Sequence, residues 1–93
     1  MTIINSSILQ ELEDVLENIV STTTQPILEE NSITAKQYLQ ELKDGLITNT
    51  EFQDLMIDLQ DELKVTKLAD DLELKVELEK AINSLIQFSS QII

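Results

Sequence analysis

The side chains that most often carry catalysis are scarce in this chain of 93 residues, which contains no His and no Cys. Without them the commonest general base and the Cys–His nucleophile pair are missing. Ser and Thr are plentiful, but none stands in a Gly-x-Ser-x-Gly or Ser-x-x-Lys motif, and no glycine-rich phosphate loop is present. We therefore expect a non-enzymatic protein with no catalytic residue.

Carboxylates, which can bind metal ions, are abundant. Three pairs of them are adjacent in the sequence: Glu29–Glu30, Asp61–Glu62 and Asp70–Asp71. Neighbouring residues on a helix point about 100° apart, so these pairs do not converge on one ion. The di-iron bundle motif needs Glu-x-x-His, which cannot occur here. We expect no metal site and no cofactor.

Charge is strongly unbalanced, with 18 acids against six lysines and a formal net charge of −12. Phosphate contact needs a basic footprint, so we expect no nucleic-acid partner. The same charge could steer the chain toward a basic protein surface. The alternative explanation is that the acids only keep an apolar bundle in solution.

Neither end of the sequence predicts membrane targeting. The start has no basic n-region followed by an apolar stretch, and the weakly charged segment Ala81–Ile93 is shorter than the ~20 residues that span a bilayer. We expect a cytoplasmic protein with no membrane partner, or a virion component if it comes from a phage.

Apolar residues recur every three or four positions, and only one Gly and one Pro occur. This pattern predicts one all-α domain over residues 1–93, a small bundle of three to four helices. A first helix is expected over Ser7–Ser21, with Ser7 as N-cap and Gln10 completing a capping box. Thr22–Thr24 and Pro26 should interrupt it, and a short helix over Pro26–Glu30 is the alternative.

A short repeat occupies the middle of the chain, where Ile33–Tyr38 and Ile47–Phe52 share one pattern fourteen residues apart. In each copy a Thr can cap a helix, a Gln or Glu three residues later can close a capping box, and an Ile and an aromatic residue can form a hydrophobic staple. The repeat predicts one helix over Ala35–Asp44, ending at Gly45, and another beginning near Asn49. Their short connection predicts a central antiparallel hairpin.

Two families share motifs with this hairpin. Asp44–Phe52 resembles the second half of an EF-hand loop, which implies Gly45 at the sharp turn and Glu51 as a bidentate calcium ligand. Gln40 and Leu42 stand where the first and third ligands belong, so we expect no calcium site. Tyr38–Met56 resembles the SHOCT helical hairpin, which implies a small interaction module, although the second helix is acidic here instead of basic.

A third resemblance is shorter. The six residues Leu28–Ile33 are similar to a segment of late-transcription coactivators of large tailed phages. This likeness implies a small phage accessory or structural component.

A break at Val65–Thr66 and a long C-terminal helix over Lys67–Ser90 are expected from the remaining pattern. Two apolar faces follow each other along this helix. The first contains Val65, Leu68, Ala69, Leu72 and Val76. The second lies on the opposite side of the helix and contains Leu74, Leu78, Ala81, Leu85, Phe88 and Ile92, with Ile82 and Ile86 beside it. Two faces predict two packing partners, one of which could be another chain.

No charged residue follows Lys80, so the second face should be buried. We expect the first face to pack on Phe52–Leu63 and the second to form a homo-oligomer or partner interface. Its predicted interaction residues are Leu78, Ile82, Leu85, Ile86, Phe88, Ile92 and Ile93. The alternative is that the same residues form the centre of the chain's own core.

Two functions are compatible with these observations. The first is a structural or assembly protein that self-associates, or docks a larger partner, through apolar helix faces. The second is a regulatory binding module, such as a transcription coactivator or inhibitor, whose acidic surface contacts a basic protein surface.

Overall fold

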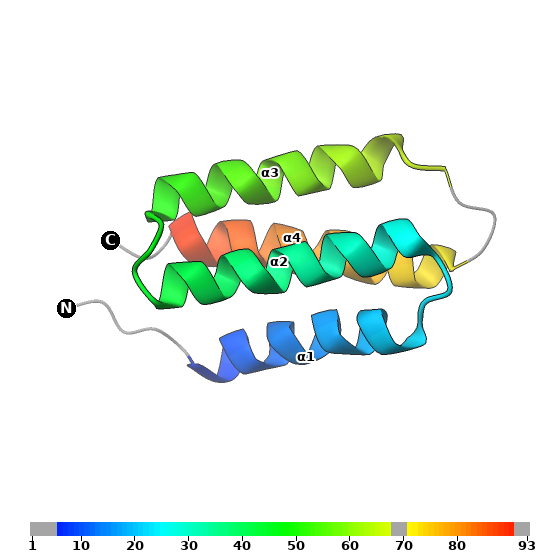
Figure 1. Cartoon of the computed structure of the whole chain (residues 1–93), viewed down its shortest axis with the longest axis horizontal. Helices are drawn as coiled ribbons and strands as arrows, with labels where there is room; N and C mark the ends of the chain where they lie inside the picture. The colour runs from blue at the N-terminus through cyan, green and yellow to red at the C-terminus, as the bar shows by residue number, and fades with distance from the viewer. Residues whose placement is uncertain (1–5, 68–70, 91–93) are drawn as a thin grey trace.

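A computed structural model describes residues 6–67 and 71–90 of the chain, and this part is all-α. It contains four helices: α1 (Ser6–Thr22), α2 (Pro26–Lys43), α3 (Asn49–Val65) and α4 (Leu72–Ser90). Successive helices are antiparallel, so the α2–α3 turn lies at the end of the bundle where α1 begins and α4 ends (Figure 1). The predicted bundle, its central antiparallel hairpin and its long C-terminal helix are confirmed.

α2 and α4 each contact all three other helices, whereas α1 and α3 do not touch within the described residues. Figure 1 shows α4 behind α2, between α1 and α3. The buried apolar side chains form one core, made of Leu9, Leu16, Ile19, Leu28, Ala35, Leu39, Phe52, Met56, Leu59, Leu63, Leu78, Ala81, Ile82 and Leu85.

α1 buries Leu9, Leu16 and Ile19, as the spacing of its apolar residues predicts. The predicted N-cap at Ser7 is wrong, because the helix already includes Ser6. The side chain of Gln10 instead bonds within the helix, where its Nε2 donates to Asp14 Oδ1 at 3.0 Å.

α2 is one continuous helix, so the expected helix start at Thr34 is wrong. Pro26 occupies the first turn, where its missing N–H costs nothing, and no Gly or Pro follows before the end of the helix. Leu28, Ser32, Ala35 and Leu39 are all fully buried and form one stripe across the expected break. Ser32 at an apolar position is what hid this stripe from the sequence pattern.

The turn between α2 and α3 has the form expected for a glycine-terminated helix. Gly45 has φ +73°, in the left-handed region that glycine adopts at little cost. Its N–H donates to the Leu42 carbonyl at 3.1 Å, and the Leu46 N–H donates to the Glu41 carbonyl at 2.9 Å. These two bonds make a Schellman motif, which satisfies carbonyls left free at the helix end.

α3 begins with the predicted capping box. Thr48 is the N-cap, its hydroxyl accepts from the Glu51 N–H at 3.1 Å, and the Glu51 carboxylate accepts from the Thr48 N–H at 2.9 Å. Phe52, Met56, Leu59 and Leu63 are buried along one face.

The expected start of the last helix at Lys67 is wrong. Thr66 is the C-cap of α3 instead of an N-cap, and α4 begins at Leu72. Lys75 connects the two elements, since its Nζ donates to the Thr66 carbonyl at 2.8 Å. Leu68 and Ala69, two residues of the predicted first face, lie outside the described residues.

Candidate functional site

The predicted interaction residues on α4 lie mostly inside the chain's own core. Leu78, Ile82 and Leu85 are fully buried, and Ile86 and Phe88 are half-buried against the same core. A second chain cannot contact the three buried residues while the bundle is folded. These three residues lie in the hydrophobic core of the single chain, where α4 contacts α1, α2 and α3.

The last two predicted interaction residues, Ile92 and Ile93, lie outside the described residues.

The first apolar face, expected to pack on α3, is largely exposed. Val65 is 79% exposed, Leu72 57% and Val76 48%. The expected burial of the first face against α3 is therefore wrong for these three residues. The second face, which contains the buried residues Leu78, Ala81 and Leu85, is the one that fills the bundle.

Acidic side chains dominate the outside of the bundle, and no described Asp or Glu is buried. α3 carries exposed acids along its outer side at helical spacing: Glu51, Asp54, Asp58, Asp61 and Glu62. Only one lysine, Lys64, lies on this helix. The outer side of α3 is therefore strongly negative.

Two of the six lysines are used between α1 and α2. Lys36 Nζ lies 2.8 Å from Glu17 Oε1, and Lys43 pairs with Glu13. The hydrogen bond from Lys36, followed by its positive charge, lowers the pKa of Glu17 below the ordinary value. These ion pairs connect α2 to α1. They leave fewer lysines to balance the acids elsewhere on the surface.

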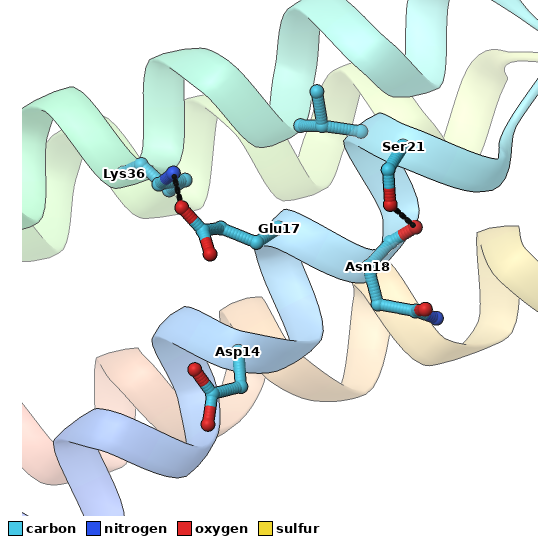
Figure 2. Close-up of a pocket in the computed structure, with 6 residues that line it drawn as sticks. Asp14, Glu17, Asn18, Ser21 and Lys36 are labelled. Carbon is cyan, nitrogen blue, oxygen red and sulfur yellow. Dashed lines mark hydrogen bonds and ion pairs between the residues drawn. The ribbon is translucent and has the colours of Figure 1, made fainter.

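A depression of about 490 Å³ lies beside the Lys36–Glu17 pair. Figure 2 shows its lining, in which Lys36 of α2 reaches Glu17 of α1, and Ser21 Oγ donates to the Asn18 carbonyl of the same helix at 3.1 Å. Asp14 and Val20 complete the wall. The lysine is already neutralised and the serine hydroxyl has no adjacent base, so nothing here is arranged for acid–base or nucleophilic chemistry.

A second depression, of about 240 Å³, lies between α1 and α4 and has a more apolar lining. Leu12 and Val15 line it from α1, and Glu77, Lys80, Ala81 and Ser84 line it from α4. We call this depression the α1–α4 groove. Both α1 residues also pack against the core with part of each side chain exposed.

The groove lies near the exposed residues at the start of α4. A shallow hollow there is lined by Leu72, Glu73, Val76 and Glu77, and Glu77 also lines the α1–α4 groove. By helical spacing, Glu73 and Glu77 lie between Val76 of this hollow and Ala81 of the α1–α4 groove, so the two hollows face different directions.

The sequence pattern did not single out Asp71, which links the α1–α2 loop to the start of α4. Asp71 precedes α4, and its carboxylate accepts from the Thr23 hydroxyl at 2.8 Å and from the Thr24 N–H at 2.9 Å, both in the α1–α2 loop. Asp71 has φ +61°, a conformation that Asp adopts more readily than most residues. The sequence pattern placed Asp71 inside the expected helix over Lys67–Ser90, and it does not reveal a partner 47 residues away.

Metal binding finds little support in the described geometry. The carboxylate of Glu51, the strongest ligand of the EF-hand resemblance, is engaged by the capping box, and that of Asp44 accepts from Gln40 Nε2 at 3.0 Å. Across residues 6–67 and 71–90 there is no group of three or more acids able to hold an ion. In the same ranges, no helix is long and apolar enough to cross a membrane.

Comparisons of this chain with protein-family models, with curated proteins and with solved structures find no match. The assignment of a function therefore depends on the surfaces described above.

Proposed function

We propose that this chain is a non-enzymatic binding module whose acidic surface contacts a basic surface of a protein partner. The observation that carries the proposal is the distribution of charge. The chain has 18 acids and only six lysines, and no described acid is buried. Two of the lysines are already held in ion pairs between α1 and α2. An unbalanced field of this kind attracts cationic partners and accelerates their encounter.

The assembly alternative has weaker support. It depended on a second apolar face of α4 that would meet another chain, and the central residues of that face, Leu78, Ile82 and Leu85, are used in the core. A net charge of −12 on each copy also opposes self-association at physiological salt. The acidic surface disfavours nucleic acid and anionic lipid for the same electrostatic reason.

Salt dependence tests the proposal. The probe is a synthetic helical peptide, about 12 residues long, with leucines on one face and lysines on the other. We expect its dissociation constant, measured by calorimetry, to rise at least about tenfold between about 0.05 and 0.5 M NaCl, because salt screens exposed charges. A peptide with glutamates in place of the lysines is the control and should not bind.

Two results would contradict the proposal. One is the absence of binding by the lysine peptide at low salt. The other is binding that does not change with salt, which would favour contact through apolar faces alone.

A further inference from the structure

We propose that the basic partner binds on the face shared by α2 and α3, through one amphipathic helix whose apolar stripe has Lys or Arg residues on both sides. This inference rests on the proposed function and adds the place and the form of the contact. The α2–α3 face has a central seam of half-buried side chains between two rows of carboxylates. The seam residues are Ile27, Thr34, Tyr38 and Leu55.

One contact shows which sides of α2 and α3 meet. Asn31 Nδ2 lies 3.4 Å from the Leu59 carbonyl oxygen. The seam shares those sides, because Leu55 stands one turn before Leu59, and the three seam residues of α2 stand one or two turns from Asn31. The helices are antiparallel (Figure 1), so Leu55 is level with Thr34. The seam is thus one strip that follows both helices, and no charged residue interrupts it.

Carboxylates border this seam on both helices. By helical spacing each lies one or two turns from a seam residue of its own helix, on the side toward solvent. Within the described residues none of them forms an ion pair. They belong to Glu30 and Glu41 of α2 and to Glu51, Asp58 and Glu62 of α3.

The lysines of these two helices lie elsewhere. Lys36 and Lys43 are paired with acids of α1. Lys64 is nine residues from Leu55, which places it on the opposite side of α3. The α2–α3 face therefore selects a partner with positive charges on both sides of its apolar stripe.

A buried acceptor beneath the seam also calls for a donor. Asn31 is 2% exposed, and its Oδ1 has no hydrogen-bond partner among the described residues. Its side chain lies between the two helices, one turn from both Ile27 and Thr34. Lys and Arg carry N–H donors on long side chains. A basic residue of the partner that enters the seam at this level would supply the missing bond.

The length of the seam suits a short helix. From Ile27 to Tyr38 the seam follows α2 for about 17 Å, at 1.5 Å per residue. A partner helix of about 12 residues has nearly the same length. Its apolar stripe would cover the seam, as an amphipathic helix does when it binds between two helices.

A second copy of this chain is the other candidate occupant, and charge argues against it. The same face of a copy would set carboxylates against carboxylates. The face fits a cationic helix better than it fits itself.

The test maps binding of the lysine–leucine peptide described above onto the ¹⁵N-labelled chain by NMR. We expect the largest amide shifts at Thr34, Tyr38, Leu55 and Asp58. Shifts centred on the α1–α4 groove, or spread evenly over the four helices, would overturn the α2–α3 face but leave the proposed function intact. No shifts at all would overturn both proposals.

Matched variants test the carboxylates. Asp58→Lys combined with Glu62→Lys should weaken the peptide about tenfold or more, because two attractive contacts become repulsive. Glu73→Lys combined with Glu77→Lys changes the net charge equally, with the same spacing, on exposed positions of α4, and should weaken it less than about threefold. Equal weakening by the two double variants would overturn the α2–α3 face and retain the acidic surface.

A second pair of variants tests the seam itself. Leu55→Ala should weaken binding about fivefold, since it removes an apolar contact from the centre of the face. Ile57→Ala alters an exposed apolar residue of the same helix, about 160° away from Leu55, and should leave binding unchanged. Circular dichroism confirms that each variant is folded. Equal effects, or the opposite order, would overturn the proposal.

Discussion

Asp71 is the residue through which the α1–α2 loop is tied to the start of α4. Its carboxylate accepts hydrogen bonds from the Thr24 N–H and the Thr23 hydroxyl. The bond from Thr24, followed by that from Thr23, lowers the pKa of Asp71 below its ordinary value. Both donors favour the ionised form, so this tie depends on the charge of the carboxylate.

The sign of the resulting pH dependence follows from the direction of the pKa shift. Because the pKa of Asp71 is lower in the folded state, its contribution is complete above the unfolded pKa, about 3.9, and is lost as the pH falls through the folded pKa. We expect the free energy of unfolding to fall less steeply below about pH 4 in Asp71→Asn than in the unaltered chain. Urea denaturation from pH 7 to pH 2 measures this.

The control for Asp71 is Asp58→Asn, which removes an exposed acid from α3 and should leave the slope unchanged. In both variants the free energy of unfolding should still fall to some extent with decreasing pH, since the pKa of Glu17 is also lowered. Equal slopes in Asp71→Asn and the unaltered chain would show that the tie to the α1–α2 loop does not form in solution.

Ser32 presents a different situation, a fully buried hydroxyl within the apolar stripe of α2. Its Oγ has no hydrogen-bond partner among the described residues, and the same is true of the neighbouring Asn31 Oδ1. Asn31 Nδ2 donates to the Leu59 carbonyl at 3.4 Å, which is long for a hydrogen bond. A buried polar atom without a partner costs about 1–3 kcal/mol.

Ser32→Ala should therefore raise the free energy of unfolding by about 1 kcal/mol or more, measured by urea denaturation. Ser89→Ala is the matched control, because Ser89 is equally buried on α4 but its Oγ donates to the Ile86 carbonyl at 2.9 Å. Both variants gain the helix propensity of alanine, so the difference between them isolates the unpaired hydroxyl. A gain no larger than that of Ser89→Ala would contradict the assignment.

At the scale of the elements, two threonines with the same local pattern have different roles. Thr48 caps α3, whereas Thr34 lies inside α2. Thr48→Ala should lower the free energy of unfolding by about 1 kcal/mol, because it removes the acceptor for the Glu51 N–H. Thr34→Ala should leave stability unchanged or raise it by a few tenths of a kcal/mol, since alanine is the better helix former.

Chemical denaturation of the two alanine variants measures this contrast. Similar losses from both would mean that α2 is interrupted near Thr34, as the repeat alone predicts.

Local sequence signals were sufficient to predict some structural elements and not others. The capping box at Thr48 and the left-handed turn at Gly45 are properties of a few adjacent residues, so their sequence predicts them correctly. Thr34 carries the same signals, but the buried stripe of α2 continues past it, and that stripe is completed by the polar Ser32. Burial on other helices overrode the local pattern there.

The candidate site was harder to predict than the helices. The two apolar faces of α4 are visible in the sequence, but their partners depend on how the helices are arranged. Leu78 and Leu85 were expected at an interface and lie in the core, whereas Leu72 and Val76 were expected to pack on α3 and are exposed. The α1–α4 groove combines residues more than 60 positions apart, such as Val15 and Ala81, and no local pattern links them.

At the scale of the whole molecule, the chain combines a complete core with an unbalanced surface. The core draws on all four helices, and α4 supplies its central contacts through Leu78, Ala81, Ile82 and Leu85. The surface carries the net charge of −12. Of the apolar end of the sequence, Ala81, Ile82 and Leu85 lie in the core, and the surface that we propose for binding is the acidic exterior.

Sedimentation equilibrium of the full chain shows whether the apolar side chains of α4 are covered within one copy, because a core completed by the chain's own helices needs no second copy. The measurement belongs at about 0.5 M NaCl, where charge repulsion is screened and cannot by itself keep copies apart. We expect a single species of 10.6 kDa from micromolar to millimolar concentration. A stable dimer at low micromolar concentration would contradict it and would restore the apolar face of α4 as an interface between chains.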